Sequence, residues 1–267
     1  MGMCVINTPL NYFPEFGLWV KREDLCCPGG PNFSKTRGVF AHVCKRTETV
    51  IGVLDTAHSQ GGWAVARACS LLDKQCLLFY PIRKSEQALG LKPQQLAAKE
   101  LGAALIHLPA GRSAVLYHQA KAQATLEQAY MMPNALKLME TVEETALEVG
   151  RTKLPRVNNV LVSTSSGTIA AGVALGLTRL NWQGNLIIHL GYSRPEKAVS
   201  SYIHKMGGSF FSCGLEFIDE HYAYVDKARP CLPSPCPMNE YYDLKLWSWW
   251  IREGRKEHGS ALFWNIG

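Results

Sequence analysis

The chain has 267 residues, of which 47% are hydrophobic and 19% charged, so it can form one large domain or two small ones with a substantial buried core. No apolar run reaches the ~18 residues that cross a bilayer, and residues 1–6 lack the basic patch and apolar stretch of a secretory signal, so we expect neither a membrane span nor such a signal. The net charge of +6 is common among enzymes and is also compatible with a polyanionic partner such as DNA.

Strands and helices alternate along the chain. Short apolar runs predict buried strands, and longer runs with apolar residues at helical spacing predict helices. The predicted strands are residues 49–54, 75–80, 104–108, 159–162 and 186–190, and the predicted helices are 61–72, 92–101, 114–130 and 169–177. Pro81 is expected to end the second strand. The alternation predicts an α/β fold with a parallel sheet covered on both faces and with ligands at the carboxyl ends of the strands.

The last part of the sequence is less regular. Residues 230–237 contain four prolines and predict an irregular loop. The aromatic stretch 240–251 predicts a helix, and residues 261–267 predict a final core strand. The nine cysteines are scattered without a second pair at metal-ligand spacing, so we expect free thiols in a reducing cytoplasm and no metal site.

Lys35 is the first residue in a setting that suggests chemistry. It lies in Asn32-Phe33-Ser34-Lys35-Thr36-Arg37-Gly38, directly after the loop Pro28-Gly29-Gly30-Pro31. A lysine that forms a Schiff base needs a rigid, water-poor setting that lowers its pKa. On this segment alone, an ordinary surface lysine is the more common interpretation.

Two turns between a strand and a helix carry small polar residues. The first contains Ser59 and Gln60, and backbone N–H groups at the following helix start can hold an anion such as a carboxylate. The second, residues 163–168, combines hydroxyl side chains, one glycine and a helix start, and it lacks the spacing of a nucleotide-binding loop, so it favours a small monophosphate. Each turn taken alone is also compatible with simple helix capping.

A fourth segment, Glu240-Tyr241-Tyr242-Asp243-Leu244-Lys245, taken alone is a helix start with acidic residues favoured by the helix dipole. The order of these segments, however, resembles that of the tryptophan-synthase-β-like enzymes of fold type II, which use pyridoxal 5′-phosphate (PLP). The resemblance is strongest to the family of 1-aminocyclopropane-1-carboxylate (ACC) deaminase and D-cysteine desulfhydrase, and it spans nearly the whole chain. The matching motifs are Thr8-Pro9-Leu10, Lys21-Arg22-Glu23-Asp24, Ser34-Lys35-Thr36-Arg37, Ser59-Gln60, Ser165-Ser166-Gly167-Thr168, Tyr242-Asp243-Leu244-Lys245 and Leu262-Phe263-Trp264-Asn265-Ile266-Gly267.

The resemblance implies a cofactor and a role for each matching residue. Lys35 would carry PLP as a Schiff base and move a proton at Cα of the substrate. Gln60 would bond the ring hydroxyl, and Asp243 would face the pyridine nitrogen. The cofactor phosphate would be held by the turn residues Ser165, Ser166, Gly167 and Thr168.

A carboxylate at Asp243 would keep the ring nitrogen protonated, because an opposite charge favours the charged form. A protonated ring is the stronger electron sink, which favours deamination, racemisation or decarboxylation over simple β-replacement. Ser59 and Tyr242 are candidates for a second acid or base, or for a nucleophile near the substrate.

The chain departs from the family pattern at several of these positions. Gln60 replaces an asparagine, serines replace glycines in the phosphate turn, and Ile266 replaces a threonine. The chain is also shorter than the family norm. These departures favour a substrate other than those of the two named enzymes.

The resemblance also implies two parallel-sheet α/β domains with the active site in the cleft between them. Residues 1–45 and 131–267 are expected to form the large, PLP-binding domain, and residues 46–130 the small one. Relatives of this fold are commonly homodimers.

Three hypotheses about function remain open. The first is a PLP-dependent lyase or deaminase that forms a carbanion at Cα of a free amino acid in the cytoplasm. The alternative is a PLP-dependent decarboxylase that acts on an amino acid attached to a thymine base, as in phage clusters that hypermodify DNA, where the host cytoplasm is the working compartment. A catalytically inactive binding module is the third, and the presence of both Lys35 and Asp243 argues against it.

Overall fold

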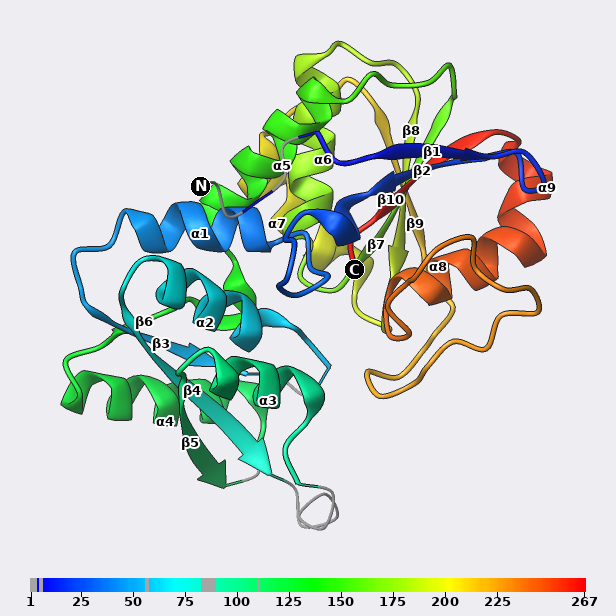
Figure 1. The fold of residues 1–267 in the computed structure, drawn as a ribbon. Helices are drawn as coiled ribbons and strands as arrows, with labels where there is room; N and C mark the ends of the chain where they lie inside the picture. The colour runs from blue at the N-terminus through cyan, green and yellow to red at the C-terminus, as the bar shows by residue number, and fades with distance from the viewer. Residues whose placement is uncertain (1–3, 5–6, 56–57, 83–89, 110) are drawn as a thin grey trace. The chain divides into compact units, whose positions relative to one another are not determined.

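The computed structural model describes residue 4 and residues 7–55, 58–82, 90–109 and 111–267 (Figure 1). Residues 1–3 and 5–6, which were considered above for a secretory signal, lie outside this part. Thr56 and Ala57, which belong to the strand-to-helix turn that contains Ser59, also lie outside it. The chain divides into two compact units, Met1–Cys4 with Cys27–Glu140 and Val5–Cys26 with Thr141–Gly267.

Unit 1 contains a four-stranded sheet in which all neighbours run parallel, in the order β5-β4-β3-β6. One face buries a cluster of apolar side chains from β4, β5 and α4. The strands are β3 (Val50–Leu54), β4 (Gln75–Ile82), β5 (Ala104–Pro109) and β6 (Tyr130–Met131), and the helices are α1 (Thr36–Cys44), α2 (Gly61–Leu71), α3 (Pro93–Glu100), α4 (Ser113–Leu126) and the 3-10 turn η3 (Asn134–Leu136).

Pro81 does not end its strand, so that prediction is wrong. β4 continues through Pro81 to Ile82, and Pro81 pairs with Leu108 of β5. On its other side, the register of β4 with β3 ends at the pair Leu54–Phe79. Among the described residues Pro81 is paired with β5 alone, and a strand position with a single neighbour is where a residue without a backbone N–H is tolerated.

The compact units differ from the expected domain division at residues 27–45 and 131–140. Both segments belong to unit 1 rather than to the larger unit. α1 packs on α2, and β6 adds to the edge of β3. Long-range pairing and packing of this kind leave no local signal in composition, so the expected domain division stays a prediction beside these compact units.

Unit 2 contains a six-stranded sheet in the order β1-β2-β10-β7-β8-β9, parallel except for the antiparallel hairpin β1–β2. The strands are β1 (Leu10–Phe13), β2 (Leu18–Arg22), β7 (Asn159–Thr164), β8 (Asn185–Leu190), β9 (Gly214–Ile218) and β10 (Ala261–Asn265). The helices are α5 (Met139–Arg151), α6 (Thr168–Arg179), α7 (Glu196–Gly207), α8 (Asp243–Trp249) and α9 (Arg255–His258), with a 3-10 turn η1 (Glu23–Leu25) and a π-helical turn η4 (Trp250–Gly254).

Both faces of this sheet are covered, as predicted. Alternate residues of β7 point to opposite faces of the sheet. Val160 and Val162 pack with α5, α6 and α7, while Leu161 packs toward α8. The α8 side is filled by the tryptophans Trp247, Trp249 and Trp250. No helix in the described part of the chain is long and apolar enough to span a membrane.

A buried ion pair joins the N-terminal hairpin to α5 within unit 2. Lys21 Nζ lies 2.8 Å from Glu148 Oε1, and neither side chain is exposed. Glu148 also accepts hydrogen bonds from the backbone N–H groups of Asn7 and Thr8, and Lys21 donates to the carbonyl of Thr8. A buried charge pair of this kind needs such extra hydrogen bonds, because taking both ions out of water is costly.

Candidate active site

Lys35 directly precedes α1 and is half-buried. Its Nζ donates a 3.0 Å hydrogen bond to the carbonyl oxygen of Ala135. Burial, together with the positive charge of Lys137, lowers the pKa of the Lys35 amine to about 8. A larger fraction of the amine is therefore neutral near pH 7 than for an ordinary lysine, which is the form that attacks an aldehyde.

The carbonyl that receives Lys35 belongs to an unusual turn. Ala135 and Leu136 have φ values of 57° and 49°, in the left-handed region that residues with a side chain seldom adopt. Leu136 is buried, and Gly61 at the start of α2 approaches it so closely that a Cβ on Gly61 would lie 2.9 Å from Leu136 Cδ1. Packing against α2 thus holds the strained turn that supports Lys35.

Ser59 and Gln60 lie at the start of α2, as predicted. Ser59 Oγ accepts a 3.1 Å hydrogen bond from the backbone N–H of Gly61. Gln60 Nε2 donates to the carbonyl oxygen of Asn32 at 3.2 Å. Since Asn32 is three residues before Lys35, unit 1 brings two of the predicted site segments together.

The predicted phosphate turn connects β7 to α6 in unit 2. Gly167 adopts φ 88°, and a Cβ there would lie 2.9 Å from Cδ1 of Tyr202, so only glycine fits without strain. Gly167 N–H donates to Thr164 Oγ1 at 3.0 Å. The turn therefore has a fixed backbone before α6 begins.

Hydroxyl groups line this same turn. The side chains of Ser166 and Thr168 are hydrogen-bonded at 2.9 Å, and Thr168 Oγ1 lies 3.2 Å from the hydroxyl of Tyr202. The first N–H groups of a helix have no acceptor within the helix, and they favour an anion. A narrow glycine turn, two ordered hydroxyls and a helix start fit a phosphate monoester.

Asp243 is the first residue of α8 and is fully buried. Its Oδ1 accepts from Ser163 Oγ at 2.8 Å, and its two oxygens also accept from the backbone N–H groups of Ile266 and Gly267. Burial raises the pKa of the Asp243 carboxyl to about 7, and these three hydrogen bonds oppose the rise. A buried acid with such a pKa suits a cationic partner, which would stabilise its ionised form.

Tyr242 precedes Asp243 and lies against the phosphate turn. Its hydroxyl shares hydrogen bonds with the side chains of Ser165 and Tyr224, and burial raises its pKa above the ordinary tyrosine value. Unit 2 therefore brings Tyr242, Asp243 and the turn at residues 165–168 to the carboxyl end of β7. This is the grouping that the strand-end rule predicts.

Several residues of this neighbourhood were not predicted. Ser163, Tyr202 and Arg194 all contact predicted site residues, and the Arg194 guanidinium donates to the carbonyl oxygen of Ser165. Ser163 lies in the predicted turn but carries no signal of its own. Arg194 follows β8, another strand end, and that position could have suggested it.

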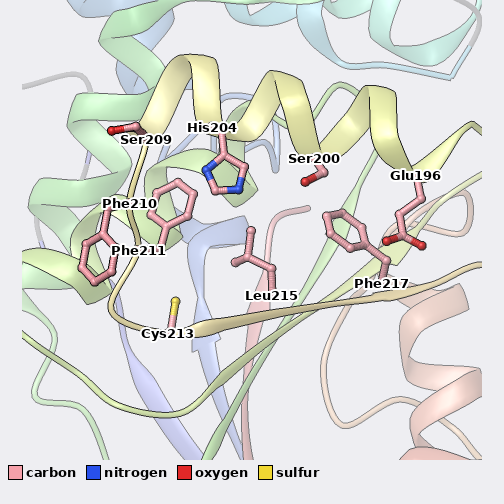
Figure 2. A pocket seen from close by; sticks show the side chains of 9 residues that line it. All are labelled: Glu196, Ser200, His204, Ser209, Phe210, Phe211, Cys213, Leu215 and Phe217. Carbon is pink, nitrogen blue, oxygen red and sulfur yellow. The ribbon is translucent and has the colours of Figure 1, made fainter.

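A pocket of about 440 Å³ lies elsewhere in unit 2, between α7 and β9. Figure 2 shows Ser200 and His204 of α7 on one side and Leu215 and Phe217 of β9 on the other. None of the predicted site residues lines it. The pocket is therefore distinct from the candidate active site.

Comparison with known proteins agrees with this chemistry. Residues 2–205 match the model of a family described as pyridoxal-phosphate dependent enzyme. A protein of Pseudomonas phage M6 named glycyl-dTMP PLP-dependent decarboxylase is 46% identical over 278 residues, which cover 99% of this chain and 100% of that protein.

Solved structures share the fold. The crystal structure of an ACC deaminase homologue has a TM-score of 0.81 at 18% identity, covering 100% of this chain and 91% of that one. Maize serine racemase has a TM-score of 0.69 at 14% identity, covering 98% of this chain and 88% of that one. These likenesses agree with the α/β fold of type II predicted from the sequence.

Proposed function

This chain belongs to the family of pyridoxal-phosphate dependent enzymes, and from that premise we propose that it removes the carboxyl group of an amino acid joined to a thymidine nucleotide. The observation that carries the proposal is the end-to-end likeness, at 46% identity, to the phage protein named for that reaction. Of the two enzymatic hypotheses drawn from the sequence, this likeness favours the decarboxylase over the deaminase of free amino acids.

The residues of the candidate site fit the cofactor. Ser165, Ser166, Gly167 and Thr168 would hold its phosphate, with the Gly167 turn too narrow for a side chain. The Lys35 amine would hold its aldehyde carbon, Gln60 its ring hydroxyl and Asp243 its ring nitrogen. When bound, PLP would supply an electron sink for the pair left on Cα as the carboxylate leaves.

Asp243 would keep a proton on the ring nitrogen. A pKa near 7 in the cofactor-free protein falls when a cation binds beside the carboxyl, because the opposite charge favours the ionised form. The hydrogen bonds from Ser163 and from the backbone of Ile266 and Gly267 hold both oxygens in place. The ionised carboxylate would then be fixed where the charge is needed, at no cost in reorganisation during the reaction.

Lys35 would deliver the proton that replaces the carboxyl group. In the proposed step the bond from Cα to the carboxylate breaks, carbon dioxide leaves, and Cα takes a proton from the Lys35 ammonium. A pKa of about 8 suits this role, since a general acid or base is most effective when its pKa lies near the working pH. Tyr242 and Ser59 are the alternative proton donors.

The chemistry also restricts how the amino acid is attached. A substrate must offer a primary amine to the cofactor aldehyde. We therefore propose that a glycyl substituent is joined to the thymine part through Cα and keeps its amine free. The product would carry a primary amine on a two-carbon arm.

The test is a decarboxylation assay on this substrate. Purified protein is loaded with PLP and incubated with a Cα-glycyl thymidine nucleotide, and carbon dioxide and the mass of the product are measured. We expect carbon dioxide and a primary amine from the wild type, and neither from Lys35→Ala, which also lacks the visible absorption of bound PLP. Turnover of D-cysteine or ACC at ordinary enzymatic rates, with an inert nucleotide, would overturn the proposal.

Three further expectations accompany this function. Salt-sensitive DNA binding would indicate a substrate nucleotide within DNA, and its absence a free nucleotide. We propose that the protein works in the cytoplasm of a host cell, as a phage enzyme of nucleotide modification would. We also propose a homodimer, which light scattering on the PLP-loaded protein tests directly.

A further inference from the structure

Beside the phosphate turn lies a cluster of two tyrosines and one arginine. Tyr192 and Arg194 follow β8, and Tyr224 comes from the loop after β9. The rings of Tyr192 and Tyr224 meet edge to face, with centroids 5.1 Å apart and planes at 87°. The Arg194 guanidinium lies 5.6 Å from the centre of the Tyr192 ring.

This cluster is tied to the candidate active site within unit 2. Arg194 donates to the carbonyl oxygen of Ser165, and Tyr224 is hydrogen-bonded to Tyr242. The loop that carries Tyr192 is anchored by Gly191 N–H, which donates to the carbonyl of Thr164 at 2.8 Å. The cluster therefore lies at the carboxyl ends of β7 and β8, where ligands of parallel sheets bind.

Arg194 makes no ion pair with any acidic residue in the described part of the chain. By contrast, Arg252 pairs with Glu220 and Glu253, and Arg179 pairs with Glu143. Arg194 is half-buried, and of its five N–H donors one is hydrogen-bonded to another described residue, Ser165. An arginine in this state can pair with a phosphate through two parallel N–H groups.

We propose that Tyr192, Tyr224 and Arg194 form the subsite for the nucleotide part of the substrate, a proposal that rests on the function proposed above. The pyrimidine ring stacks on a tyrosine face, and the Arg194 guanidinium pairs with the 5′-phosphate. Both tyrosines are half-buried, so each keeps surface for a base. Stacking on aromatic side chains binds single nucleotides in many proteins.

Two phosphates could occupy the Arg194 donors, because the turn at residues 165–168 is also the proposed site of the cofactor phosphate. Our proposal assigns Arg194 to the nucleotide. Separate binding measurements for PLP and for the nucleotide distinguish the two phosphates, because each titration reports the affinity of one ligand and involves no chemical turnover.

The experiment measures binding of dTMP and of thymidine to the PLP-loaded protein by calorimetry. For Arg194→Gln we expect dTMP affinity to fall roughly 10- to 100-fold, as for loss of a charge-assisted phosphate contact, with thymidine affinity little changed. Tyr192→Leu should lower the affinity for both ligands, whereas Tyr192→Phe should keep both affinities unchanged. Arg179→Gln, which removes the same charge from a paired arginine on α6, is the matched control.

An Arg194→Gln variant with weakened PLP binding and normal dTMP binding would overturn the assignment, as would unchanged dTMP binding in both the Arg194 and Tyr192 variants. A short oligothymidylate as competitor distinguishes a free nucleotide from one within DNA, and loss of its binding in Arg194→Gln supports the subsite equally. Failure of the proposed function has a different signature: dTMP binds through these residues, yet no carbon dioxide forms from the glycyl nucleotide.

Discussion

Ser163 donates a 2.8 Å hydrogen bond to Oδ1 of Asp243, and both side chains are fully buried. Ser163 is on β7 and Asp243 begins α8, so the bond joins the sheet to the helix that covers it. It opposes the rise in the pKa of Asp243 that burial causes. This relationship links the stability of unit 2 to the protonation of a proposed cofactor-binding residue.

Removing that hydrogen bond should change how stability depends on pH. Burial raises the pKa of Asp243 from 3.8 to about 7, so the folded protein favours the neutral acid. In the cofactor-free wild type, the free energy of unfolding should therefore fall as pH rises from about 4 to about 7 and level off above that, with each pKa unit worth ~1.4 kcal/mol. In Ser163→Ala the fall should continue to higher pH.

Urea unfolding from pH 4 to pH 9 measures this, with Asp243→Asn and Ser248→Ala as controls. The asparagine variant should lack the fall, because it has no acid at that position. Ser248→Ala, a buried serine on α8, should follow the wild type. Identical pH profiles for wild type and Asp243→Asn would refute a raised pKa.

Lys137→Ala should make Lys35 more basic. The positive charge of Lys137 contributes to lowering the pKa of Lys35 to about 8, although burial contributes more. Removing it should lower the neutral fraction of Lys35 at pH 7 and slow the growth of the visible PLP absorption by a factor of roughly two to three, a small effect because Lys137 is exposed and screened by solvent. Lys121→Ala, an exposed lysine on α4, should leave the rate unchanged, and a faster reaction in Lys137→Ala would contradict the prediction.

Gly167→Ala should weaken both folding and cofactor binding. A side chain at φ 88° is strained by about 1–2 kcal/mol, and the added Cβ would lie 2.9 Å from the ring of Tyr202. Gly17→Ala is the matched control, because Gly17 also has a positive φ, 60°, but nothing within 4 Å of an added Cβ. We expect both variants to lose stability and Gly167→Ala alone to lose PLP affinity in a fluorescence titration. Equal PLP affinity in the two variants would mean that this turn does not bind the cofactor.

Glu148→Gln should destabilise unit 2 strongly. The substitution leaves Lys21 buried without its counter-charge, which typically costs about 3–5 kcal/mol. The double variant Lys21→Met with Glu148→Gln should recover part of the loss, since it removes the unpaired charge. Chemical denaturation of the wild type, Lys21→Met, Glu148→Gln and the double variant at one pH tests this, and additive losses in the double variant would mean that the two side chains do not interact.

The sequence predicted best the elements that are buried on both faces. β3, β7 and β8 were recognised because parallel strands covered by helices form continuous apolar runs. β10 was expected as a final core strand and proves to lie inside the sheet, between β2 and β7. The turns at Ser59 and at residues 165–168 were placed correctly before α2 and α6, because they follow such strands.

Features that depend on distant packing were missed. The left-handed Ala135 that receives the Lys35 hydrogen bond has no signal, since alanine seldom adopts that conformation. α5 was missed although Val142, Ala146 and Val149 lie on one face at helical spacing, because the charged residues between them make the segment polar on average. Arg194 and Tyr192 follow a strand end, but nothing in their own neighbourhood separates them from ordinary surface residues.

The central place of β10 also has a consequence for how the protein is made. β2 and β7 leave the ribosome long before β10, the strand that separates them. At roughly 5–20 residues per second, the nascent chain spends several seconds with two unpaired strand edges that can pair with other chains. Unit 2 should therefore complete its sheet late in synthesis, while unit 1 already has all four of its strands, and chaperones that shield exposed edges should raise the yield of folded protein.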